Sequence, residues 1–128
     1  MNTLAHKSIL VVDDEPLVAD TLSLLLMIDK HRVDVARDGE TALARYKSGR
    51  YDLVITDLMM PGIDGLELAR LIRAQVPQQR IILVSGHLGA LSLSDRDKMQ
   101  LQNVDGLLAK PFSPQQLREA VRAMFPNG

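Results

Sequence analysis

The chain has 128 residues, 46% of them hydrophobic and 24% charged, with a formal net charge of −1 and no cysteine. This balance is typical of one folded globular domain, and it argues against a disordered chain, a disulfide framework or a thiolate metal site. It offers no basic surface for direct nucleic-acid binding. No apolar run is long enough for a membrane span and the N-terminus has no signal-peptide pattern, so we expect a cytoplasmic protein without membrane contact.

The first half of the chain predicts two pairs of a strand and a helix. Residues 8–12, Ser-Ile-Leu-Val-Val, form a short apolar run typical of a strand that is buried on both faces. Pro16 suits the first turn of the helix that follows, because the first helical NH groups have no partner within the helix. The two pairs cover residues 8–12 and 16–29, then residues 32–36 and 40–47.

The second half predicts three more pairs. The β-forming run 53–56 ends in Asp57, and a Pro-Gly turn then leads to a helix that Asp64 would cap. Ser113 followed by proline, with glutamine at the third helical position, is a strong start signal for the last helix. The pairs cover residues 53–56 and 64–76, residues 80–85 and 94–103, and residues 105–109 and 113–125.

The alternation of strands and helices predicts a single α/β domain over residues 1–128, with a doubly wound (βα)5 flavodoxin-like fold. Its expected centre is a five-stranded parallel sheet of order 2-1-3-4-5, covered by helices on both faces. All strands of such a sheet point the same way, so the residues that follow them meet at one edge. Ligands of open α/β sheets bind outside this carboxyl edge.

Four of the predicted strands end in side chains that carry chemistry: Asp13 with Asp14, then Asp57, Ser85 and Lys110. We expect the three carboxylates to converge and to repel one another unless a cation joins them. Oxygen ligands with an open side suit Mg²⁺, which is commonly shared with a phosphate. Lys110 would supply a second positive charge, Ser85 a hydroxyl donor and Asp57 a carboxylate nucleophile. Taken alone, Asp57 also fits a turn former or a helix cap.

Several short motifs, in their order along the chain, resemble the receiver domains of two-component response regulators. They extend over essentially the whole sequence, and the ordered set is far more specific than any one of them. The motifs are Val11-Val12-Asp13-Asp14-Glu15, Asp57 with Met60-Pro61-Gly62, Asp64-Gly65, Ser85-Gly86 and Lys110-Pro111-Phe112.

The resemblance implies a phosphorylation-dependent signalling switch whose only reactions are self-phosphorylation and autodephosphorylation at Asp57. The phosphoryl group would come from a histidine kinase or a His-containing phosphotransfer protein. Mg²⁺ would be the cofactor. It would be bound by Asp57, by Asp14 directly, by Asp13 through water and by the backbone carbonyl of Met59.

The resemblance also assigns the other half of the site and the output surface. Ser85 and Lys110 would contact the phosphoryl group, and the Lys110–Pro111 peptide bond is commonly cis in the family. The fourth helix, fifth strand and fifth helix would form the surface that acts on an output domain or a downstream protein. A homodimer through the same surface stays open.

Two features depart from the family pattern. Leu107 stands where receivers usually carry a tyrosine or phenylalanine, so we expect a leucine packed on the sheet in place of the usual aromatic switch. The stretch after Ser85 is longer than usual and rich in glycine and serine. We expect a mobile segment from Gly86 to Leu93, with a regular helix beginning only near Ser94.

Three other functions fit parts of the pattern. A metal-dependent phosphatase with an aspartate nucleophile would place that residue in an Asp-x-Asp pair, whereas Leu58-Met59 follows Asp57. A flavin binder of the same fold would need a phosphate-binding loop after the first strand, where this chain has acids. A pseudo-receiver that binds partners without phosphorylation is the remaining alternative, and the full set of acids argues against it.

Overall fold

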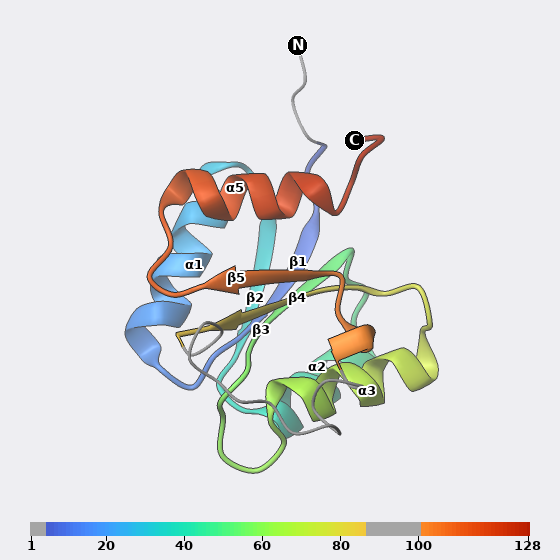
Figure 1. Cartoon of the computed structure of the whole chain (residues 1–128). Helices are drawn as coiled ribbons and strands as arrows, with labels where there is room; N and C mark the ends of the chain where they lie inside the picture. Colours follow the sequence, from blue (N-terminus) through green and yellow to red (C-terminus); the bar gives the residue numbers. More distant parts are fainter. Residues whose placement is uncertain (1–4, 87–100) are drawn as a thin grey trace.

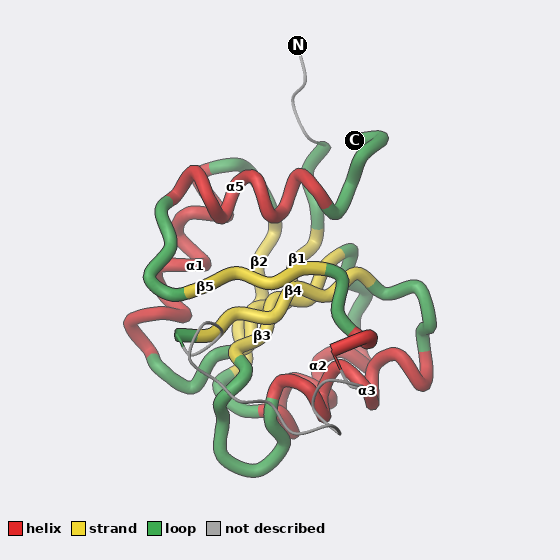
Figure 2. Tube along the Cα trace, in the orientation of Figure 1, coloured by secondary structure: helices red, strands yellow, loops and turns green. Residues whose placement is uncertain are grey.

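A computed structural model describes residues 5–86 and 101–128, and it shows one five-stranded parallel sheet with helices on both faces (Figures 1 and 2). The strand order is β2-β1-β3-β4-β5, which confirms the predicted doubly wound fold. The strands are β1 Ser8–Val12, β2 Arg32–Ala36, β3 Leu53–Asp57, β4 Arg80–Ser85 and β5 Gly106–Ala109.

The helices form two layers. In Figure 1, α1 and α5 cover one face of the sheet, and α2 and α3 cover the other. The helices are α1 Pro16–Ile28, α2 Gly39–Ser48, α3 Gly65–Gln75 and α5 Pro114–Ala123, with a 3-10 turn, η1, at Leu101–Asn103. Most of the predicted fourth helix, and all but Gly86 of the segment expected to be mobile, lie outside the described residues.

Side-chain caps begin three of the helices where the sequence predicts or permits them. The Asp64 carboxylate accepts a hydrogen bond from the backbone NH of Glu67, and Asp38 caps α2 in the same way. Ser113 and Gln116 form a reciprocal capping box at α5. Each cap satisfies NH groups that have no partner within the helix, which fixes the residue at which the helix starts.

β5 begins at Gly106, one residue later than predicted, because Asp105 links the chain to β4 and α3 through its backbone and its side chain. Its backbone NH donates to the Ile81 carbonyl, while its carboxylate accepts from the backbone NH of Ile81 and pairs with Arg73. The side chain therefore continues the pairing with β4 at the point where the backbone ladder starts.

The described core forms three clusters, and alternation along β1 contributes side chains to the two largest. In β1, Ile9 and Val11 face α1 and α5, whereas Leu10 and Val12 face α2 and α3. Both faces are covered, so an all-apolar strand is stable here, as in other parallel sheets. Among the residues that the structure describes, no helix is both long enough and apolar enough to cross a membrane.

His31 is a buried polar residue at the edge of the sheet opposite to the predicted site. Its Nδ1 accepts a hydrogen bond from the backbone NH of Lys7 at 3.0 Å. Burial lowers the pKa of the imidazole, and the charge of Asp29 only partly opposes this. The folded chain therefore favours the neutral ring, which alone leaves Nδ1 free to accept.

We expect the free energy of unfolding to fall as the pH decreases from about 7.5 to about 5.5, because the unfolded chain binds the His31 proton more tightly. A His31→Gln variant keeps an acceptor but does not titrate, so its stability should depend less on pH in this range. Urea denaturation followed by circular dichroism measures both. Equal pH dependence in the native chain and His31→Gln would contradict the assignment.

Candidate functional site

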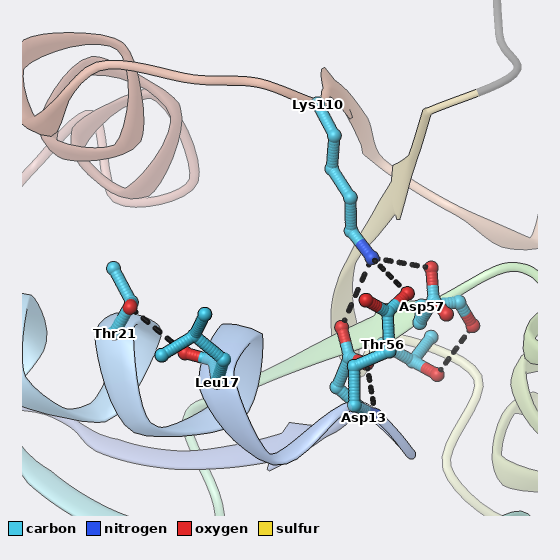
Figure 3. Close-up of polar contacts among 7 residues, drawn as sticks. Asp13, Leu17, Thr21, Thr56, Asp57 and Lys110 are labelled. Carbon is cyan, nitrogen blue, oxygen red and sulfur yellow. Dashed lines mark hydrogen bonds and ion pairs between the residues drawn. The ribbon is translucent and has the colours of Figure 1, made fainter.

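The candidate site lies at the carboxyl edge of the sheet, where the strand register brings consecutive strand ends into line. Val12 pairs with Thr56 across β1 and β3, and Asp57 pairs with Val84 across β3 and β4. Ser85 in turn pairs with Ala109, the residue before Lys110. The register therefore brings Asp13, Asp57 and Lys110 together, as Figure 3 shows.

The acids come together as expected. Asp13 is fully buried, Asp57 is 5% exposed, and Asp14 is the most exposed of the three. One carboxylate oxygen of each lies within 4.8 Å of those of the other two. The backbone NH of Glu15 donates to Asp13 Oδ1 at 2.9 Å, which holds that carboxylate toward the start of α1.

Lys110 joins the two buried acids. Its Nζ lies 3.2 Å from Asp13 Oδ2 and 3.2 Å from Asp57 Oδ1, and Figure 3 shows the side chain extending from the end of β5 toward both. Its backbone NH donates to the Ser85 carbonyl at 3.0 Å, and the Lys110–Pro111 bond is cis. Burial alone would lower the pKa of the Lys110 ammonium, but Asp13 and Asp57 outweigh it and the pKa is raised. Lys110 is therefore held as a cation.

The surroundings of Asp57, in contrast, disfavour its charged form. Burial raises the pKa of its carboxyl group, the charge of Asp13 raises it further, and Lys110 only partly counteracts them. Negative charge at this edge of the sheet is thus in excess of what one ammonium neutralises. A hard divalent cation with oxygen ligands would relieve that excess, so the donor set fits Mg²⁺.

The other two predicted site residues occupy different surroundings. Ser85 is buried at the end of β4, beside the backbone of Lys110. Met59 lies in the loop after β3 with its side chain 57% exposed, so any contribution to a metal would come from its backbone. The roles predicted for the two residues stay predictions.

Two residues that stand in the quoted motifs, but that received no role from the sequence, also contact the site. Glu15 Oε1 lies 3.8 Å from Lys110 Nζ. Gly65 lies so close to β3 that a Cβ there would be 2.2 Å from the Asp57 carbonyl oxygen. A glycine at the first position of a helix, where stronger helix formers are available, was the signal for this close approach.

Leu107 lies on the edge strand β5 and is 52% exposed. It pairs in register with Leu83 of β4, but it is not part of the buried core. The expectation of a leucine on the sheet surface therefore agrees with its place, although its side chain is only half covered.

Comparison with known proteins identifies the family. Residues 9–122 match the response regulator receiver domain. The chain belongs to this family. Response regulator TrrA from Thermotoga maritima, solved in complex with Mg²⁺-BeF, is 38% identical, with a TM-score of 0.83 over 92% of this chain and 98% of that one. Chemotaxis protein CheY4 from Vibrio cholerae is 27% identical, with a TM-score of 0.82 over 94% of this chain and 99% of that one.

Curated relatives of this receiver domain are transcriptional regulators. The chain is 33% identical to transcriptional regulatory protein ResD of Bacillus subtilis over 98% of its own length and 50% of that protein. It is 36% identical to transcriptional regulatory protein TcrA of Mycobacterium tuberculosis, covering 94% of this chain and 46% of that protein. The chain spans about half the length of these relatives. Receiver domains are signalling modules of two-component systems and not conventional enzymes.

The position of Lys110 predicts how the pKa of Asp57 responds to its removal. In Lys110→Met the ammonium that lowers the pKa is absent, while burial and Asp13 still raise it, so the pKa of Asp57 should rise above its value in the native receiver domain. Carbon-13 NMR titration of labelled aspartates, without divalent cations, measures this. Arg80→Met removes a positive charge from the opposite edge of the sheet and should leave the pKa of Asp57 unchanged. An unchanged or lower value in Lys110→Met would refute the prediction.

Proposed function

We propose that this receiver domain, residues 1–128 as one unit, is a phosphorylation-dependent switch in which Asp57 accepts a phosphoryl group. The observation that carries the proposal is the ammonium of Lys110 held 3.2 Å from both Asp57 and the buried Asp13. A nucleophilic carboxylate, a fixed cation and an acidic cluster at one edge of the sheet are what phosphoryl transfer to aspartate requires.

Each residue of the site has its own role in the phosphoryl transfer. A carboxylate oxygen of Asp57 forms the new O–P bond while the N–P bond of phosphohistidine breaks and its electron pair stays on the imidazole. Lys110 and the Ser85 hydroxyl would stabilise charge on the phosphoryl oxygens. Asp13, Asp14, Asp57 and the Met59 carbonyl would hold Mg²⁺. When bound, Mg²⁺ supplies positive charge to the carboxylates and the phosphoryl group.

The product would act through the neighbouring strands. An aspartyl phosphate adds negative charge beside Lys110. The backbone NH of Lys110 donates a hydrogen bond to the Ser85 carbonyl. Any displacement of Lys110 or Ser85 is thus transmitted to the ends of β4 and β5. The surface that includes β5 and α5 would present the change to an output domain or a downstream protein, and the switch is a shift between two populations.

Mass spectrometry after incubation with Mg²⁺ and acetyl phosphate tests the proposed acceptor. The native domain should gain the mass of one phosphoryl group, and Asp57→Ala should gain none. Asp20→Asn, an exposed acid of α1, is the matched control and should be phosphorylated like the native domain. No adduct on the native domain with any small donor would favour a pseudo-receiver, and an adduct retained in Asp57→Ala would place the acceptor elsewhere.

The exposed face of α1 supports a helical protein as the natural phosphodonor. Among the described residues, seven large apolar side chains are exposed, and four of them lie on this helix. Leu17, Leu24 and Ile28 lie on one side of the helix and Met27 lies beside them, so they form an apolar stripe that the exposed Thr21 interrupts once. The stripe starts at the site, because Glu15, the residue before α1, contacts Lys110. A helix of a histidine kinase or phosphotransfer protein would pack there with its histidine near Asp57.

Substitutions in this stripe should separate protein donors from small donors. Leu17→Ser and Leu24→Ser should slow phosphoryl transfer by about tenfold from whichever phosphorylated histidine kinase of the same organism is the fastest donor to the native domain. Labelling by acetyl phosphate should not change. Val76→Ser, at an exposed apolar residue beyond α3, is the control. Equal slowing with both kinds of donor would show damage to the site and not to docking.

A further inference from the structure

The turn between β2 and α2 contributes no acid to the site, yet it contacts both segments that would hold the metal. The backbone NH of Asp13 donates to the Ala36 carbonyl at 3.1 Å, so the end of β2 fixes the backbone of the first acidic segment. Three residues later, Gly39 packs against Ile63 in the loop between β3 and α3. This loop, residues 58–64, includes Met59.

The contact at Gly39 leaves no room for a side chain. A Cβ on Gly39 would lie 2.6 Å from both the carbonyl oxygen and the Cβ of Ile63, whereas real Cβ atoms essentially never approach another atom within 3.0 Å. The backbone of Gly39 is not in the left-handed region, so close approach is the reason for the glycine. One of the two contacted atoms belongs to the backbone, so relief requires that the loop or α2 move.

The loop is anchored at its two ends by other contacts. The Leu58 NH donates to the Val84 carbonyl, and the Gly65 NH donates to the Leu58 carbonyl, each at 2.9 Å. Met60 is buried in the core cluster under α2 and α3, which Ile63 also contacts. Where the loop and not α2 moves, the displacement at Ile63 falls on the residues between these two ends, which include Met59.

We propose that Gly39 is a positioning residue for the Mg²⁺ site. By letting the first turn of α2 lie directly against the backbone of Ile63, it sets where the loop lies relative to Asp57, and thereby the position of the Met59 carbonyl. This inference rests on the proposed function, which assigns that carbonyl to the metal.

Calorimetric titration with Mg²⁺ alone tests the role of Gly39. Gly39→Ala should bind Mg²⁺ about tenfold more weakly than the native domain, the usual size of an effect transmitted through a supporting residue. Gly106→Ala is the matched control, because its new methyl group would crowd Met124 and Ile82, away from the loop. It should leave the affinity for Mg²⁺ unchanged.

A second variant covers the case in which Gly39→Ala does not fold. Ile63→Ala introduces no clash, but it removes the side-chain atoms that hold the loop on the core, so it should also weaken Mg²⁺ binding, by less than Gly39→Ala. Unchanged affinity in the variants that fold, with only a lower thermal midpoint, overturns the role of Gly39 and leaves the proposed function intact. Failure of the native domain to bind Mg²⁺ overturns the proposed function itself.

Discussion

The ammonium of Lys110, shared between two buried carboxylates, is the interaction on which the arrangement of the site depends. Asp13 and Asp57 are almost completely buried, and burial of even one unpaired carboxylate is strongly unfavourable. One lysine cannot neutralise both acids and Asp14 as well. The folded domain therefore keeps a local excess of negative charge, and burial together with the charge of Asp13 raises the pKa of Asp57. The same excess that destabilises the isolated site makes it receptive to a divalent cation.

The apolar strands provide the stability that this charged edge lacks. β1, β3 and β4 lie in the middle of the sheet with helices on both faces, so they can be apolar along their whole length. Their parallel direction places one end of every strand at the same edge. The helices that the structure describes cover the two faces of the sheet and not this carboxyl edge, so polar residues can lie at the strand ends. The doubly wound topology thus separates a dry core from a charged rim within one short domain.

The sequence was sufficient to predict the features that depend on local pattern. The runs 8–12 and 80–85 matched strands because burial on both faces leaves a continuous apolar signature, and parallel direction then aligned Asp13, Asp57 and Lys110. Distances that depend on tertiary contact were not predictable, even where a glycine at a helix start signals a close approach. The approach of Gly65 to the Asp57 carbonyl and of Gly39 to Ile63 joins segments from different elements, and no local periodicity encodes either distance. The start of β5 was misplaced for the same reason, because the partners of Asp105 are remote.

The position of Lys110 also explains how so small a chemical event could be transmitted. Its ammonium forms ion pairs with Asp13 and Asp57, and its backbone NH donates a hydrogen bond to the Ser85 carbonyl. Lys110 therefore connects the acidic cluster to β4 and β5. A phosphoryl group on Asp57 would compete with Asp13 for the Lys110 ammonium. Loss of either ion pair would let Lys110, and with it the end of β5, change position. Among the described strands, β5 is at the edge of the sheet and pairs with β4 alone, so it could respond without disturbing the core. If Asp57 accepts a phosphoryl group as proposed, the backbone of this edge strand would be the more direct route from the site to the surface, because Leu107 stands in place of an aromatic ring.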